Sequence, residues 1–96
     1  MMNKHHAIYR AALEKWGEEA QFDQAVEECA ELIIALKHFR RNRADRQQII
    51  NELADVALIV GQLSYMLGEK QVDRAIQVKI DKLKKLLEAA EPVEGP

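Results

Sequence analysis

Apolar residues recur at helical spacing in four segments of the chain, and glycines or polar residues separate these segments. Recurrence at about 100° per residue predicts amphipathic helices. With only four Gly and two Pro in 96 residues, the chain has few residues that would interrupt them. We therefore predict an all-α fold of antiparallel helices. The predicted helices cover residues 7–15, 19–39, 46–67 and 70–90.

Local signals mark the ends of these helices. Gly17 is predicted to end the first helix and Gly68 the third, since glycine favours the left-handed conformation that follows many helices. Asp45, followed three residues later by Gln48, forms a capping-box pattern ahead of the third helix. Residues 1–91 are predicted to form a single domain. Residues 92–96, with two Pro and one Gly, are predicted to form a flexible C-terminal tail.

Each predicted helix has a distinct arrangement of apolar positions. In the first helix, Ile8, Ala12 and Leu13 are expected to face inward. The second has an apolar arc that consists of Phe22, Ala25, Val26, Cys29, Leu32, Ile33 and Leu36, and a polar arc opposite that contains Gln24, Glu27, Glu28, Glu31 and His38. The fourth is expected to present an inner stripe of Val72, Ile76, Ile80, Leu83 and Leu87. The third is apolar nearly all round, which predicts burial on most sides.

The third predicted helix needs more neighbours than one copy of the chain provides. We therefore expect a homodimer or homotetramer in which helices from two subunits complete a four-helix bundle. The alternative is a compact monomeric bundle.

Composition restricts the class of partner. The net charge of -2 gives no support to a nucleic-acid polymer as partner. The single Cys29 cannot form an internal disulfide, and no signal peptide opens the chain, so we expect a cytoplasmic protein. No uninterrupted apolar run is long enough to span a bilayer, so no membrane partner is expected.

Two acidic motifs interrupt the apolar pattern. Residues 27–31 read E-E-x-x-E and residues 52–55 read E-x-x-D, so each motif places two carboxylates three residues apart on one helix face. The midpoint between the motifs falls in the polar segment 40–43, and a turn there would bring them level. Clustered carboxylates repel one another and raise one another's pKa values. Because buried acidic groups normally pair with bases or coordinate metals, the motifs predict a cation site.

The ligand types indicate which cation. All-oxygen sites suit Mg²⁺, Mn²⁺ or Ca²⁺, and Mg²⁺ often completes its coordination with substrate phosphates. Zinc would require His or Cys ligands, and Cys29 lies on the apolar arc. Di-iron bundles use a Glu-x-x-His motif, whereas Glu28 and Glu52 are followed three residues later by Glu31 and Asp55. Mg²⁺, with Mn²⁺ as a substitute, is the predicted ion.

The two motifs and their spacer of about twenty residues resemble the MazG-type all-α nucleoside triphosphate pyrophosphohydrolases. Trp16-Gly17, Gln21, Glu31-Leu32 and the segment 50–56 also look like the short, single-domain members. The resemblance covers roughly residues 8–67. It implies a four-helix bundle assembled from two subunits and Mg²⁺-dependent hydrolysis of a (d)NTP to the (d)NMP and pyrophosphate, with housecleaning of the nucleotide pool as the expected role.

Carried over residue by residue, the resemblance assigns roles to the acidic side chains. Glu28, Glu31, Glu52 and Asp55 match the metal-ligand positions, and Glu27 matches the supporting acid of the first motif. Glu27 or Glu31 is the candidate to accept the proton of the attacking water. Many relatives have a further Glu where this chain has Asn51, so the number of metal ions stays open.

Candidate substrate contacts come from the flanking segments. Lys79 and Lys82 are candidate phosphate contacts, the alternative being a solvated face. Trp16 is a candidate for stacking on the base, the alternative being a core position. Gln21 and Gln24 are candidates for reading a base edge, and ordinary surface positions are the alternative. His38 lies two turns beyond Glu31 and is expected to be peripheral. Arg40, Arg41 and Arg43 lie about 18 Å along the axis from the motif, too far to reach the metal of their own subunit. They are expected to form a solubilising basic turn, the alternative being contact with a partner's substrate.

Two other functions remain open beside the enzyme. One is a non-catalytic module that senses nucleotides or Mg²⁺. The other is a helical interaction module without a nucleotide ligand.

Overall fold

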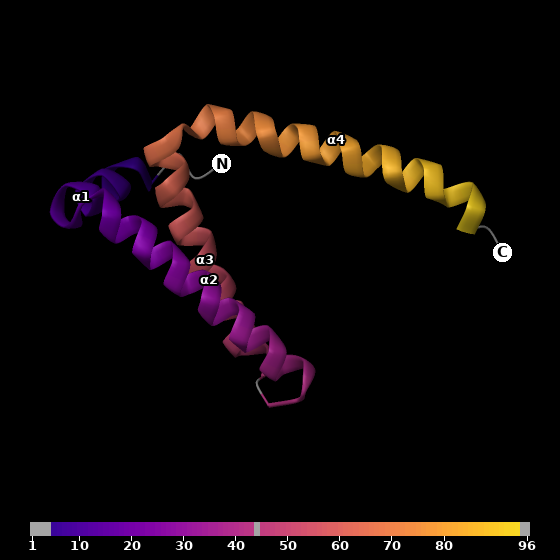
Figure 1. Cartoon of the computed structure of the whole chain (residues 1–96), viewed down its shortest axis with the longest axis horizontal. Coiled ribbons are helices and arrows are strands. Elements are labelled where there is room, and N and C mark those ends of the chain that lie inside the picture. Colours follow the sequence, from indigo (N-terminus) through magenta and orange to yellow (C-terminus); the bar gives the residue numbers. More distant parts are fainter. Residues whose placement is uncertain (1–4, 44, 95–96) are drawn as a thin grey trace.

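Four α-helices account for nearly all of the structure, a computed structural model that describes residues 5–43 and 45–94, with side chains as far as residue 89. In chain order they are α1 (His6–Trp16), α2 (Glu18–Arg40), α3 (Arg46–Leu67) and α4 (Glu69–Glu94). No strand occurs in the described ranges, so the all-α prediction is confirmed (Figure 1).

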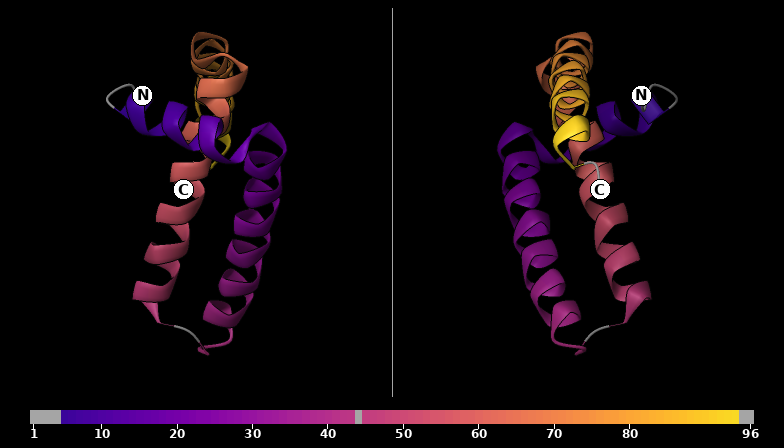
Figure 2. Two further views of the ribbon diagram at one scale, coloured as in Figure 1. Left: turned by 90° about the vertical axis from the view of Figure 1, so that its left-hand side faces the viewer. Right: turned by 90° about the vertical axis from the view of Figure 1, so that its right-hand side faces the viewer.

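Helices α2 and α3 form an antiparallel hairpin (Figure 2). Asn42, in the turn, has φ 60°, a left-handed conformation that Asn tolerates better than most residues. The predicted capping box starts α3: the Asp45 carboxylate accepts a hydrogen bond from the Gln48 backbone N–H at 3.0 Å. In return, the Gln48 side-chain oxygen accepts one from the Asp45 N–H at 2.9 Å. These bonds satisfy backbone donors that the first turn of a helix leaves unpaired.

Helix α1 packs against the open end of the hairpin (Figure 2). A sharp corner at Gly17 joins α1 to α2. Gly17 has φ 87°, where a side chain would be strained. The α1 side chain buried against the hairpin is Tyr9, whereas Ile8, which we expected to face inward, is 64% exposed. Two glutamines join α1 to the hairpin: Gln62 donates to the Tyr9 carbonyl at 2.9 Å, and Gln21 donates to the Ala12 carbonyl at 3.4 Å.

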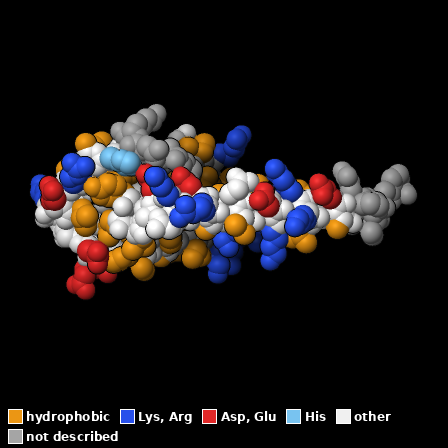
Figure 3. All heavy atoms as spheres, turned by 90° about the horizontal axis from the view of Figure 1, so that it is seen from above, with side chains coloured by type: hydrophobic (Ala, Val, Ile, Leu, Met, Phe, Trp, Pro, Cys, Tyr) orange, Lys and Arg blue, Asp and Glu red, His pale blue; other side chains and the backbone are white. Residues whose placement is uncertain are grey.

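Helix α4 projects from the hairpin as an arm (Figures 1 and 3). Gly68, with φ 130°, redirects the chain between α3 and α4. The predicted inner stripe of α4 is wrong for the single chain, because Ile76, Ile80, Leu83 and Leu87 are exposed. The helix also ends at Glu94 rather than at residue 90. Residues 92–94 of the expected tail are thus helical, and residues 95–96 lie outside the described residues.

The hairpin closes along two half-buried stripes whose spacing alternates between three and four residues, as in knobs-into-holes packing. The α2 stripe is Gln21, Ala25, Glu28, Leu32 and Ala35, and the α3 stripe is Ile49, Glu52, Val56, Ile59, Leu63 and Met66. Glu28 and Glu52 therefore occupy seam positions. This arrangement corrects the expectation for α2, because α3 packs along the edge of the acidic arc and much of the apolar arc turns outward.

An apolar face covers the side of the hairpin away from the acidic side chains. We define this outer apolar face by its exposed large side chains, which are Val26, Ile33 and Leu36 on α2 and Ile50, Leu53 and Val60 on α3. At 100° per residue these positions lie on one side of both helices. The radius of gyration is 17.2 Å, against about 12.5 Å for a compact 96-residue domain. The single chain is therefore not a compact bundle.

Helix α3 is long and apolar enough to cross a membrane by length and composition, with 22 residues and a window of mean hydropathy 1.2. We expected no membrane span because no uninterrupted apolar run is long enough, and that criterion does not detect a helix in which polar residues interrupt the apolar ones. The core helix of a helical bundle has the same composition. Glu52 and Asp55 lie inside α3, and a carboxylate at a bilayer centre costs roughly 2.5–3.5 kcal/mol or more.

The capping box gives a stability prediction. Asp45→Ala removes the acceptor for the Gln48 N–H, so we expect a loss of about 1 kcal/mol in the free energy of unfolding. Urea unfolding at one fixed protein concentration measures it. Asp45→Asn, which keeps a capping oxygen, should lose much less, and equal losses in the two variants would contradict the capping role.

Candidate metal centre

Three carboxylates converge in the middle of the hairpin seam. Glu28 and Glu31 come from α2 and Glu52 from α3, and one oxygen of each lies within 4.8 Å of the others. The convergence follows from the antiparallel register, which places the second turn of α3 opposite the middle of α2. Three of the four predicted ligands are thus together, from both motifs. We call these three residues the acidic cluster.

Asp55, the fourth predicted ligand, lies beside the acidic cluster. It is exposed, and it lines the same cavity as Glu28. Its negative charge contributes to raising the Glu28 pKa, which places the two carboxylates within electrostatic reach. Asp55 is one helical turn from Glu52 on α3 and therefore extends the cluster toward α1.

The acidic cluster is electrostatically strained. The pKa of Glu28 is raised above its ordinary value, first by a hydrogen bond with Glu31, then by desolvation and by the charges of Asp55, Glu31 and Glu52. One oxygen of Glu52 is buried and has no hydrogen-bond partner. A buried oxygen without a donor and a carboxyl whose pKa is raised by neighbouring negative charges both indicate missing positive charge. A cation bound by these oxygens would supply it.

Glu27, the predicted supporting acid, lies apart from this group. It is exposed on α2, and it is neither a member of the acidic cluster nor a lining residue of the cavities described below. Its role in accepting a proton stays a prediction.

A cavity of about 280 Å³ lies between α1 and the hairpin, and we call it the α1-side cavity. Glu28 and Asp55 form its acidic edge, and most of the remaining lining is apolar or aromatic. Among its lining residues are Tyr9, Trp16, Gln21, Gln24, Leu58 and Gln62. All three predicted base-contact residues therefore line one cavity next to the acidic cluster.

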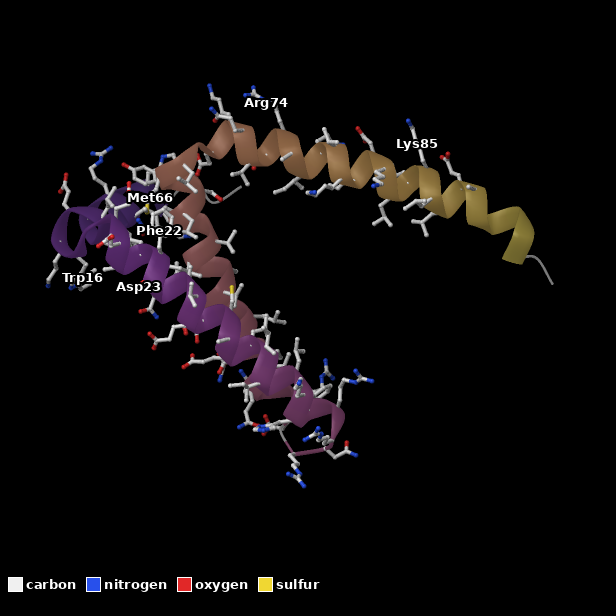
Figure 4. All side chains as sticks on the ribbon, viewed as in Figure 1. Trp16, Phe22, Asp23, Met66, Arg74 and Lys85 are labelled. Carbon is white, nitrogen blue, oxygen red and sulfur yellow. The ribbon has the colours of Figure 1, made fainter. Side chains whose placement is uncertain are left out.

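The structure decides between the alternatives for two of these three residues. Trp16 is 61% exposed at the corner between α1 and α2, so the core alternative is wrong (Figure 4). Gln21 is buried and bonded to the Ala12 carbonyl, so the surface alternative is wrong. Gln24 is exposed, as a surface position would be, and also lines the cavity.

Sequence reasoning missed Tyr9 and Gln62 as cavity residues. The Tyr9 hydroxyl is buried without a hydrogen-bond partner, and burial followed by the charge of Glu69 raises the Tyr9 pKa. Gln62 is buried and shares its stripe on α3 with Asp55. Two signals could have found them: Tyr9 precedes Ala12 and Trp16 at helical spacing, and a polar residue on the most apolar helix is unusual.

A second cavity, of about 370 Å³, lies at the turn end of the hairpin, and we call it the turn-side cavity. Glu31 and Glu52 of the acidic cluster form one edge. His38, Arg43, Gln48 and Asn51 are among the other lining residues. His38 was expected to be peripheral and Arg43 to belong to a solubilising turn, and both line this cavity together with two residues of the acidic cluster.

Lys79 and Lys82 are exposed on α4, which projects away from the hairpin (Figures 1 and 3). Arg74 and Lys85 of the same helix point away from the hairpin in Figure 4. One chain therefore does not bring Lys79 or Lys82 to its own acidic cluster.

Comparison with known proteins gives one finding. Residues 17–87, more than half of the chain, match the model of the MazG nucleotide pyrophosphohydrolase domain. The match includes both acidic motifs and extends into the C-terminal half of α4. No curated protein and no solved structure matches the chain.

The raised pKa of Glu28 gives a prediction with a definite sign. The folded chain binds this proton more tightly than the unfolded chain, whose carboxyl has its ordinary pKa of 4.5. Ionisation of Glu28 therefore costs stability as pH rises from 4.5 through the raised pKa. Without metal, Glu28→Gln should raise the thermal midpoint at neutral pH and change it little in acid. With Mg²⁺, the same variant should lose most of the metal-dependent rise that the unsubstituted protein shows.

Thermal unfolding at two pH values, with and without Mg²⁺, measures both effects. Asp23→Asn is the matched control, since Asp23 is an exposed carboxylate on the same helix outside the cluster. A lower midpoint of metal-free Glu28→Gln at neutral pH would contradict the repulsion.

Proposed function

Because the chain belongs to the MazG nucleotide pyrophosphohydrolase family, we propose that it hydrolyses a (d)NTP to the (d)NMP and pyrophosphate in a Mg²⁺-dependent reaction. The observation that carries the proposal is the convergence of Glu28, Glu31 and Glu52 from two helices. Housecleaning of the nucleotide pool in the cytoplasm, with no nucleic-acid polymer or membrane as partner, is the proposed setting.

The residues of the acidic cluster fit Mg²⁺. All candidate ligands are carboxylate oxygens, which Mg²⁺ and Mn²⁺ prefer, and the buried oxygen of Glu52 lacks a donor. Glu28, Glu31 and Glu52 would hold the ion, with Asp55 completing the set from the α1 side. When bound, the ion would neutralise charge on the phosphate oxygens during phosphoryl transfer.

The chain's own carboxylates orient the attacking water and accept its proton. Attack in line at the α-phosphorus breaks the bond to the bridging oxygen and releases pyrophosphate. Glu31 is the favoured acceptor, because it lies in the acidic cluster and hydrogen-bonds Glu28. Glu27, one residue before Glu28, is the second candidate.

The α1-side cavity suits the nucleoside. Trp16 offers an exposed ring for stacking. Gln24 offers amide groups for a base edge, and the buried Tyr9 hydroxyl lacks a hydrogen-bond partner. Gln21 has one donor engaged with Ala12 and contributes its remaining polar atoms.

A second copy of the chain is the proposed cover for the outer apolar face. Two hairpins packed through this face would form a four-helix bundle, as the homodimer or homotetramer predicted above requires. The face lies opposite the acidic cluster, so this packing would leave both cavities open. In such an assembly Lys79 and Lys82 of one subunit are candidates to contact the phosphates held by its partner.

The enzymatic proposal is tested by pyrophosphate release from a panel of ordinary and modified nucleoside triphosphates, with and without Mg²⁺. At least one nucleotide should release pyrophosphate only with Mg²⁺ or Mn²⁺. Glu52→Gln, which preserves size, should lower the rate by about 100-fold or more, since several kcal/mol of charge stabilisation depend on the ion. Asp23→Asn is the matched control.

Absence of release with every nucleotide would overturn the enzymatic proposal. In that case, thermal stabilisation by Mg²⁺ with a non-hydrolysable nucleotide would identify a sensing module. Absence of any stabilisation would leave the helical interaction module.

The assembly proposal has its own test. Val60→Asp places a charge on the outer apolar face and should convert the oligomer to monomer, as measured by light scattering after size exclusion. Ala11→Asp is the control, because Ala11 is exposed on α1 and lies outside this face. A monomeric unsubstituted protein, or an unchanged oligomer in Val60→Asp, would contradict the role of the face.

A further inference from the structure

We propose that the turn-side cavity holds the β- and γ-phosphates of the substrate and that Arg43 and His38 bind them there. This inference rests on the proposed function. It assigns a direction to the substrate along the hairpin: the nucleoside lies toward α1 and the pyrophosphate leaves from the turn.

The acidic cluster lies between the two cavities. Glu31 and Glu52 line the turn-side cavity, whereas Glu28 and Asp55 line the α1-side cavity. Cleavage between the α- and β-phosphates at the cluster requires the nucleoside and the pyrophosphate to extend away from it. The two cavities provide one space for each product.

The linings of the two cavities differ in charge. The α1-side cavity has aromatic and amide side chains, two carboxylates and no Lys, Arg or His among the described residues that line it. The turn-side cavity also has two carboxylates, from Glu31 and Glu52, but adds a guanidinium, an imidazole and two amides from Arg43, His38, Gln48 and Asn51. Phosphate oxygens carry most of the charge of a nucleotide, and Arg presents a planar set of donors that matches them. The charged half of the substrate therefore fits the turn side.

Backbone hydrogen bonds hold Arg43 and His38 in place. The Arg43 N–H donates to the His38 carbonyl at 2.8 Å, so the turn fixes the backbones of the two residues together. Gln48 is held by the capping box with Asp45, and Asn51 accepts a hydrogen bond from Gln47 at 2.9 Å. The distance along α2 from Glu31 to His38 is seven residues, or about 10 Å. Arg43 lines the same cavity as Glu31 and His38, which a measurement along the helix axis alone does not show.

The same turn offers a matched control. Arg41 lies two residues before Arg43 and is also exposed, but it lines a separate hollow with Lys37 and Arg40. Arg41→Gln and Arg43→Gln therefore make the same charge change in the same turn on different surfaces. A general effect of net charge would be equal in the two variants.

The test compares the affinities of three ligands in the presence of Mg²⁺: the preferred nucleoside triphosphate as a non-hydrolysable analogue, its monophosphate and inorganic pyrophosphate. Arg43→Gln should weaken the triphosphate and pyrophosphate by roughly 10- to 100-fold, as expected for hydrogen bonds to charged groups, and leave the monophosphate unchanged. His38→Ala should act in the same direction, Arg43→Lys should restore part of the affinity, and Arg41→Gln should change little. Isothermal titration measures these affinities, and product inhibition by pyrophosphate checks them during turnover.

Three results would overturn the inference: unchanged triphosphate affinity in Arg43→Gln, equal losses for monophosphate and triphosphate, or equal losses in Arg41→Gln and Arg43→Gln. Thermal unfolding of each variant identifies a turn that has lost its structure, in which case Arg43→Lys gives the deciding affinities. If the unsubstituted protein releases pyrophosphate but Arg41→Gln and Arg43→Gln have the same triphosphate affinity, the proposed function stands and only the direction of the substrate is wrong. If it releases none from any nucleotide, the proposed function fails first.

Discussion

The antiparallel register of α2 and α3 is the constraint on which the rest of the structure depends. It is fixed at one end by the Asp45–Gln48 capping box and along its length by half-buried side chains spaced three and four residues apart. This register places Glu28 and Glu52 opposite each other in the seam, where other bundles place apolar residues. A shift by one helical turn would separate the motifs by about 5 Å. The acidic cluster is therefore a property of the pairing and of neither helix alone.

Carboxylates in a seam weaken the packing that positions them. The pKa of Glu28 is raised by the hydrogen bond with Glu31, by desolvation and by the neighbouring carboxylates, so ionising Glu28 among them is unfavourable. The buried oxygen of Glu52 has no hydrogen-bond donor. Such a site is stable only if apolar burial elsewhere exceeds this cost. Within one chain that burial is small, because Tyr9 and Ile59 are the only buried apolar side chains among the described residues. A second copy packed on the outer apolar face would add further apolar burial.

Helix positions and types could be read from the sequence because local rules determine them. Gly17, Gly68 and the capping box end or start helices through their own backbone chemistry, and their predicted places are confirmed. The direction in which each helix faces is a tertiary property. Apolar periodicity favoured an inward arc on α2, whereas α3 packs along the edge of the acidic arc. The same limit explains Ile8 and Tyr9: both suit an interior position, and only the path of α1 across the hairpin buries one and exposes the other.

The candidate site was predictable only where helix geometry alone determines which residues meet. Spacing and helix phase were sufficient to select Glu28, Glu31 and Glu52, because a short turn between two helices brings equidistant residues together. Distance along the axis failed for Arg43, since it lies in the turn after α2 and lines a cavity together with Glu31 and Glu52. A position on a helix therefore fixes which groups share a face, but cavities at helix ends depend on the turn. In this hairpin the acidic cluster comes from the regular part of the helices and the Arg43 guanidinium from the turn, and a nucleotide likewise carries its charge at one end.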